Sequence, residues 1–267
     1  MIDVHCHLQF EAFKDDYDEV IKRAFHNGVT KIINASTQIS SSEAGVALAE
    51  QYPELFATIA IHPHHADKVE PDWIKKLEQL ASHPKVLGIG ECGLDYFSYK
   101  SNGIVDPTRQ KEVFEAQIEL AHRYKLPLQI HNRHAGKDIL EILRHHKNLL
   151  GDPPGMFHCF AGDMDVLKGA LDLGFYLGFD GNSMYKGLAP GETVELKDLI
   201  RATPLDRIVI ETDSPYLAPL PHRGTRNEPA YAIITGHYIA DLKHILFETL
   251  VEQTNKNVYT IFSKLKN

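Results

Sequence analysis

The feature of this 267-residue chain that most limits its fold is a regular alternation of short apolar segments with longer amphipathic ones. The apolar segments read as strands at residues 2–8, 31–35, 56–61, 86–91, 126–131, 155–160, 175–179 and 207–213. Apolar residues recur at helical spacing at 15–28, 40–51, 71–82, 107–124, 135–146, 163–173, 194–201 and from 229 to the end. Strands that are apolar on both faces are typical of a parallel sheet covered by helices, and eight strands close a barrel. We therefore predict a single (β/α)8 TIM barrel of α/β class over residues 1–267.

A doubly wound open sheet is the main alternative to the barrel. Such a sheet normally has a Gly-rich phosphate turn after its first strand, and here that turn reads Leu8-Gln9-Phe10. The chain also lacks a Pro/Ser-rich linker that would divide it into two domains. The barrel is therefore the favoured fold.

The composition is that of an ordinary soluble globular protein, with 43% hydrophobic and 24% charged residues. No apolar run reaches the roughly 18 residues of a membrane span, and the N-terminus has no secretory signal pattern, so we expect a cytoplasmic protein. The cysteines Cys6, Cys92 and Cys159 are odd in number and widely spaced, which argues against a disulfide framework. We interpret them as apolar fillers between the sheet and its helices.

Two histidines stand two positions apart on the first predicted strand. Successive side chains on a strand point to opposite faces, so His5 and His7 project together. Neutral imidazole is the commonest metal ligand, and such a pair forms half of a metal site. The alternative is that two polar histidines simply end an ordinary strand.

Further polar residues stand at the ends of other predicted strands. These are His62, Glu91, His131, His158 and Asp213. Each has an ordinary explanation alone, such as a surface histidine or an Asp that starts a turn. In a barrel, however, all of them lie with His5 and His7 at the C-terminal mouth, where barrel enzymes keep their active sites. The joint pattern predicts a metal site.

Six ligands are too many for one catalytic ion with an open position and suit two ions that share a carboxylate. We assign His5, His7, Glu91 and Asp213 to one ion. Glu91 also bridges to a second ion, with His131 and His158. Asp213 is the predicted general base, and Glu91 the second catalytic residue. This is hydrolase chemistry, and the mixed ligands suit Zn²⁺, Mn²⁺, Fe²⁺ or Co²⁺, whereas Mg²⁺ prefers oxygen alone.

Six motifs stand out along the chain: Asp3-Val4-His5-Cys6-His7, Gly88-Ile89-Gly90-Glu91-Cys92-Gly93-Leu94-Asp95-Tyr96, Leu126-Pro127-Leu128-Gln129-Ile130-His131, Phe157-His158-Cys159-Phe160, Glu211-Thr212-Asp213-Ser214-Pro215-Tyr216 and Arg223-Gly224-Thr225-Arg226-Asn227-Glu228-Pro229. Together they resemble the successive signatures of TatD-type metal-dependent deoxyribonucleases, which are amidohydrolase-like TIM barrels. The resemblance implies a cytoplasmic, Mg²⁺-dependent 3′-5′ exonuclease linked to DNA repair and degradation, with metal ligands at the positions assigned above. The expected partner is single-stranded DNA, and the expected state a monomer.

Two features depart from the family pattern. The usual acidic residue of the His-x-Arg-Asp/Glu-Ala element is replaced by His134, so a substrate contact there differs. The loop from Phe97 to Asp106 is long, which reshapes the mouth and leaves the preferred substrate open.

Three residues are predicted to bind substrate. Guanidinium groups match phosphate oxygens with paired donors, so Arg133 and Arg226 are candidate phosphate clamps, and His62 is a candidate contact to the phosphate or leaving group. A surface salt bridge of Arg226 with Glu228 is an alternative. His64 and His65 are expected on the loop surface.

Two other functions stay open at this point. The net charge of −8 is unfavourable for a phosphate-binding surface, which favours an ester or amide hydrolase on the same barrel, such as an aminoacyl-tRNA deacylase or a small cyclic amide hydrolase. A non-catalytic metal-dependent binding protein is the third hypothesis, and it gives no reason for an acidic residue such as Asp213 beside an open two-ion site.

Overall fold

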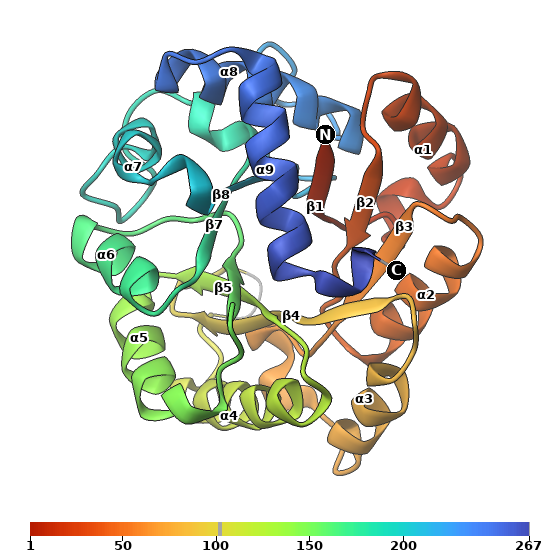
Figure 1. The fold of residues 1–267 in the computed structure, drawn as a ribbon. Coiled ribbons are helices and arrows are strands. Elements are labelled where there is room, and N and C mark those ends of the chain that lie inside the picture. The colour runs from red at the N-terminus through yellow and green to blue at the C-terminus, as the bar shows by residue number, and fades with distance from the viewer. Residues whose placement is uncertain (101–102, 267) are drawn as a thin grey trace.

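Eight parallel strands in sequential order form the centre of the computed structural model, which describes residues 1–100 and 103–266 (Figure 1). The strands are β1 (Ile2–Cys6), β2 (Lys31–Asn34), β3 (Leu55–Ile59), β4 (Val86–Asp95), β5 (Leu128–Arg133), β6 (Gly155–Phe157), β7 (Tyr176–Phe179) and β8 (Ile208–Ile210). The amide of His7 donates a 2.8 Å hydrogen bond to the carbonyl of Ser214, which brings the chain after β8 back to β1. The predicted TIM barrel is confirmed.

Helices α1 to α8 form a ring outside this barrel, and α9 lies across it (Figure 1). The helices are α1 (Tyr17–His26), α2 (Ile39–Glu50), α3 (Trp73–Ala81), α4 (Pro107–Tyr124), α5 (Gly136–His145), α6 (Met164–Asp172), α7 (Leu196–Ala202), α8 (Ala232–Lys243) and α9 (Phe247–Ile261). The segment predicted to be helical from 229 to the end contains both α8 and α9, which are separated because His244 adopts a left-handed conformation (φ 55°) that ends α8. Residue 267 of that stretch lies outside the described residues.

The last helix closes one end of the barrel. The apolar cluster inside the barrel, which includes Ile2 and Val209, packs against Val258, Ile261 and Phe262. Helix α9 lies across the barrel in Figure 1, and Nδ2 of its Asn257 donates a 2.7 Å hydrogen bond to the carbonyl of Ile208, at the start of β8. Since α9 covers the N-terminal ends of the strands, the opposite, C-terminal mouth is the end open to a ligand.

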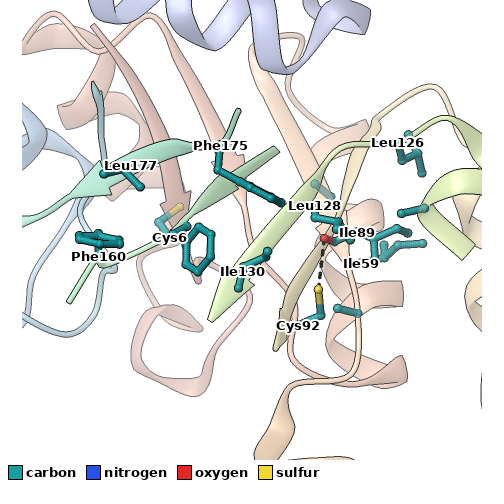
Figure 2. Close-up of a cluster of buried hydrophobic side chains, with 14 of the residues drawn as sticks. Cys6, Ile59, Ile89, Cys92, Leu126, Leu128, Ile130, Phe160, Phe175 and Leu177 are labelled. Atoms are coloured by element: carbon teal, nitrogen blue, oxygen red, sulfur yellow. Dashed lines mark hydrogen bonds between the residues drawn. The ribbon is translucent and has the colours of Figure 1, made fainter. Parts of the chain in front are cut away.

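The larger apolar core lies between the strands and the outer helices. Cys6 and Cys92 are fully buried in it, and Figure 2 shows Sγ of Cys92 directed at the carbonyl oxygen of Ile89, 3.7 Å away. Cys159 is only partly buried, and its Sγ accepts a 3.3 Å contact from Nδ2 of Asn182. All three thiols are free.

Strand β4 is longer than predicted. It runs four residues beyond Glu91 and pairs with β5 as far as Asp95, opposite Arg133. Gly93 makes this possible, because its φ is 139° and a Cβ at this position would collide with the carbonyl oxygen of His131. The extension carries Asp95 to the mouth. The long loop predicted after it, Phe97 to Asp106, includes residues 101–102, which lie outside the described part of the chain.

None of the helices in residues 1–100 and 103–266 combines the length and apolar character that a membrane span requires.

Candidate metal centre

The six predicted ligands come together at the C-terminal mouth of the barrel. They come from five of the strands: β1 and the residue after it, the middle of β4, strand β5, the turn that follows β6 and the turn that follows β8. All six side chains are at least largely buried, although their charges or polar nitrogens make burial costly without partners. For most of the six side chains, the polar partner is another member of the same six.

The first group contains His5, His7 and Asp213 with one oxygen of Glu91. Nε2 of His5 lies 3.2 Å from Nε2 of His7, and Oδ1 of Asp213 lies 3.5 and 3.3 Å from these two nitrogens. Oε2 of Glu91 lies 3.6 and 3.7 Å from the same nitrogens. Four ligand atoms bonded at 2.0–2.1 Å to a tetrahedral ion are about 3.4 Å apart, so this group matches the space that a divalent ion needs.

The second group contains His131 and His158 with the other oxygen of Glu91. Oε1 of Glu91 lies 2.7 Å from Nδ1 of His131 and 2.7 Å from Nε2 of His158, and those two nitrogens are 3.2 Å apart. The 2.7 Å separations are hydrogen-bond lengths, and a cation between these atoms would widen them slightly. The two oxygens of Glu91 therefore face two different histidine pairs.

The environment of the carboxylates keeps them charged. Burial alone would raise the pKa of Glu91, but the neighbouring His158, together with hydrogen bonds from His131 and His158, holds that pKa well below its usual range. Burial likewise opposes ionisation of Asp213, and the hydrogen bond from His7 with the charge of His5 lowers the pKa of Asp213 instead. Anionic oxygens that face imidazole nitrogens are the donor set that zinc and similar ions take.

The backbone around Asp213 points its side chain into the mouth. Asp213 has a left-handed φ of 53°, a conformation that Asp adopts more readily than most residues. Its amide donates a 2.9 Å hydrogen bond to the carbonyl of His5, which fixes the turn against β1. The carboxylate is 13% exposed, so it borders both the ion group and the solvent that fills the mouth.

His62, predicted as a substrate contact, lies against Glu91 instead of open solvent. Its Nδ1 accepts a 3.0 Å hydrogen bond from the amide of His64, so its proton is on Nε2, which lies 3.3 Å from Oε1 of Glu91. Burial lowers the pKa of His62 to about 3, which keeps the ring neutral. His62 is therefore placed to support the bridging carboxylate.

The two candidate arginines have different surroundings. The Arg133 guanidinium lies 4.0 Å above the Phe97 ring, and its Nη1 donates a 2.8 Å hydrogen bond to the hydroxyl of Tyr99. Arg226 instead forms a two-pronged salt bridge with Asp16, at 2.8 and 2.6 Å. The alternative pairing of Arg226 with Glu228 was wrong, because Glu228 pairs with Arg23 at 2.7 Å.

Sequence reasoning missed several buried acids beside the site. Asp95 contacts His131. Oδ2 of Asp95 also lies 2.9 Å from Nε2 of His64, a residue that was expected on the loop surface. A carboxylate oxygen of Glu211 lies within 4.8 Å of a ring nitrogen of His5 and of a ring nitrogen of His158. The periodicity of a strand gives no sign of such partners, although Asp95 and Glu211 both belong to the quoted motifs. His134 lies outside the ligand groups and its Nε2 contacts the carbonyl of Pro190 at 2.8 Å.

Known proteins match this chain along nearly its whole length. A family model described as TatD related DNase matches residues 2–263. The chain belongs to the TatD-related DNase family. Two of its TatD-family relatives are the uncharacterized metal-dependent hydrolase YabD of Bacillus subtilis (strain 168), 37% identical over 266 residues, and the 3′-5′ ssDNA/RNA exonuclease TatD of Enterobacter lignolyticus (strain SCF1), 33% identical over 271 residues; each match covers 98% of both chains.

Solved structures of TatD-family proteins share the fold. The crystal structure of the TatD homolog YjjV from Escherichia coli K12 superposes with a TM-score of 0.89 at 28% identity, over 98% of each chain. The structure of a TatD family hydrolase from Entamoeba histolytica gives a TM-score of 0.84 at 23% identity, over 98% of this chain and 97% of that one. This chain is accordingly a metal-dependent hydrolase of the TatD family.

Proposed function

We propose that this TatD-family hydrolase is a two-metal deoxyribonuclease that removes nucleotides from the 3′ ends of single-stranded DNA. The observation that carries the proposal is the division of Glu91, whose Oε2 faces His5 and His7 while its Oε1 faces His131 and His158. A carboxylate in this position could be shared by two divalent ions, and such a pair could stabilise the attacking and leaving oxygens of a phosphodiester. Relatives 33% and 32% identical carry the description of 3′-5′ ssDNA/RNA exonuclease.

Asp213, Glu91 and His62 would have different roles in this reaction. Two divalent ions, Mg²⁺ during turnover or Zn²⁺ or Mn²⁺ in their place, would supply Lewis acidity and a nucleophilic water at neutral pH. Asp213 would accept the proton of that water, since its carboxylate borders the mouth and is held in the charged form. Glu91 would be shared by the two ions, and His62 would donate toward Glu91 from the segment after β3.

The surface around the mouth favours a nucleic acid over a small ester. Among the described residues, four of the six exposed large apolar side chains lie in loops that follow β4, β7 and β8, namely Ile104, Leu188, Tyr216 and Leu220, and a fifth, Met164, begins α6 after β6. Unpaired bases have apolar faces that stack on such side chains, most strongly on aromatic rings. Arg133 adds a cation at the same mouth and is the candidate contact to a phosphate.

The test is digestion of end-labelled single-stranded DNA, single-stranded RNA and a panel of small esters and amides across Mg²⁺, Mn²⁺ and Zn²⁺. We expect nucleotide release from the 3′ end of DNA, and loss of this release to background in Glu91→Gln and Asp213→Asn. Glu50→Gln, a change in an exposed carboxylate far from the mouth, is the control and should keep wild-type activity. Full activity in either site variant would refute the assignment. Turnover of esters with none of DNA would favour the ester or amide hydrolase that the net charge of −8 suggests.

A further inference from the structure

Asp95 lies at the end of the extended part of β4 and is almost completely buried. Its Oδ2 lies 3.0 Å from Nε2 of His131 and accepts a 3.0 Å hydrogen bond from the hydroxyl of Tyr99. The other oxygen, Oδ1, accepts a 2.9 Å hydrogen bond from the amide of Phe97. A buried carboxylate in this position is fully supplied with donors, and it is not among the six predicted metal ligands.

The contact with His131 decides which ring nitrogen carries a proton. An ionised carboxylate can only accept, so Nε2 of His131 must donate to it. In a neutral imidazole the proton on Nε2 leaves Nδ1 bare. Nδ1 is the nitrogen that lies 2.7 Å from Oε1 of Glu91 and 3.2 Å from Nε2 of His158, inside the second group of candidate ligands.

We propose that Asp95 is a positioning residue of the metal centre, which fixes the tautomer and ring orientation of His131 so that Nδ1 faces the cation shared with Glu91 and His158. The proposal rests on the two-metal function above. A carboxylate on the outer nitrogen of a ligand histidine makes that histidine a better ligand, and loss of such a partner typically lowers metal affinity by about 10–100-fold.

The other candidate histidines are held in different ways, so the effect should be confined to one ion. Nδ1 of His7 lies 2.9 Å from the backbone carbonyl of Ala35. The rings of His5 and His158 are stacked with centroids 4.0 Å apart, and their Nδ1 atoms have no hydrogen-bond partner among the described residues. His131 alone of these four histidines has a hydrogen-bonded carboxylate on the ring nitrogen away from its ion group.

Asp95 also joins His131 to the surface of the mouth. The hydroxyl of Tyr99 donates to Asp95 and accepts from Nη1 of Arg133 at 2.8 Å. The chain of contacts thus runs from an arginine at the mouth through Tyr99 and Asp95 to a candidate ligand. Tyr99→Phe would break this chain at one point while leaving the contact between Asp95 and His131, and it therefore separates the two parts of the network.

The experiment is a titration of the metal-free protein with Zn²⁺ alone against a competing chelator, in the wild type and in Asp95→Ala, Asp95→Asn and Tyr99→Phe. We expect two binding steps in the wild type. Asp95→Ala should weaken one step by about 10–100-fold and leave the other within about twofold. Asp95→Asn keeps an acceptor oxygen and should recover part of the loss, and Tyr99→Phe should change either step by less than about threefold.

A second readout follows the ring itself. The ¹⁵N shifts of the His131 ring, assigned by the spectrum of His131→Gln, should report a proton on Nε2 in the Zn²⁺-loaded wild type and an altered or mixed tautomer in Asp95→Ala. The control Asp138→Asn, which removes a carboxylate that bonds Tyr96 and not His131, should leave both readouts unchanged.

Equal weakening of both steps together with a lower melting temperature of the metal-free protein would make Asp95 merely structural and overturn the proposal, as would unchanged binding in Asp95→Ala. If Asp95→Ala does not fold, Asp95→Asn decides by the same two readouts. A wild type that binds no ion would overturn the proposed function instead, and the ring shifts of the metal-free protein above about pH 9, where the His131 ring is neutral, would still test Asp95.

Discussion

The hydroxyl of Thr212 donates a 2.7 Å hydrogen bond to Oδ2 of Asp3, which stands 209 residues earlier in the chain. The amide of Thr212 also donates to the other oxygen of Asp3, at 3.0 Å. Both residues are buried, and the contact joins the chain that leaves β8 to β1. It therefore closes the barrel at the point where Asp213 meets His5 and His7.

This closure leads to a prediction for Thr212→Val, which keeps the shape of the side chain and removes the hydroxyl. Oδ2 of the buried Asp3 carboxyl then loses its donor, whereas Oδ1 keeps the amide of Thr212, and the cost of an unsatisfied buried polar group is about 1–3 kcal/mol. We expect the free energy of unfolding in urea to fall by that amount. The matched control is Thr235→Val, because the hydroxyl of Thr235 is buried without a hydrogen-bond partner among the described residues. Its stability should be unchanged or slightly higher, and equal losses in the two variants would contradict the argument.

The positions of the candidate ligands could be predicted from the sequence, because they depend on the local geometry of each strand. The alternation of His5 and His7 places both rings on one face of β1, and the barrel brings Glu91, His131, His158 and Asp213 to the same mouth. Each of these residues stands in or just after its strand, where periodicity locates it. Glu91 lies between His5 and His7 on one side and His131 and His158 on the other, and the assignment of these ligands to two ions stays a prediction.

The partners of these residues could not be predicted in the same way. Asp95 reaches His131 only because β4 continues past Glu91, and this continuation depends on pairing with β5 and on the space that Gly93 leaves. The pairing of Arg226 with Asp16 joins residues 210 positions apart. Contacts of this kind depend on side-chain directions in three dimensions, which a single sequence does not give.

A buried acid behind the site should make stability depend on pH. Burial, aided by the charge of Asp213, raises the pKa of Asp180 to about 7. The folded state then holds a proton that the unfolded state releases above about pH 4, so Asp180 stabilises the fold at acid pH and this contribution is lost as the pH rises toward 7. The slope for one proton is about 1.4 kcal/mol per pH unit at most.

We therefore expect Asp180→Asn to gain stability relative to the wild type as the pH is raised from 4.5 to 7.5, when urea unfolding is followed in the presence of a chelator. Asn keeps the oxygen that accepts the 2.7 Å hydrogen bond from the amide of Asn182. The control is Asp163→Asn, which also removes a carboxylate that caps backbone amides, at the start of α6, and should show no such trend. Parallel curves for the wild type and Asp180→Asn would show that Asp180 does not titrate in this range.

Metal binding should compete with a proton on His131. Burial disfavours the charged ring, but hydrogen bonds to Asp95 and Glu91 outweigh it and raise the pKa of His131 to about 9. Below that pH the metal-free protein carries a proton on Nδ1 that a cation must displace, so the apparent affinity of the ion at Glu91, His131 and His158 should rise with pH, by up to tenfold per unit between 6 and 8.5.

The measurement is chelator competition with Zn²⁺ at several pH values, in the wild type and in His131→Gln. The amide of Gln offers an oxygen ligand that needs no deprotonation, so this variant should bind more weakly but with a flatter dependence on pH. An equally steep dependence in His131→Gln would show that the displaced proton belongs to another group.

Arg133 and Arg226 should differ in what they contribute to substrate binding. The guanidinium of Arg133 is held by two aromatic rings and the hydroxyl of Tyr99, with no carboxylate partner among the residues that the structure describes, whereas both terminal nitrogens of Arg226 bond Asp16. A phosphate can therefore reach Arg133 without breaking an ion pair, and must displace Asp16 to reach Arg226.

We expect Arg133→Ala to raise the KM for single-stranded DNA about tenfold and to lower the salt dependence of binding by about one ion. Arg226→Ala should change KM by less than about threefold and, since its salt bridge is exposed, lower the free energy of unfolding by no more than about 1 kcal/mol. Binding is measured on a 3′-phosphorothioate oligonucleotide at several salt concentrations, and a loss of affinity in Arg226→Ala as large as that in Arg133→Ala would instead place both arginines on the path of the DNA strand.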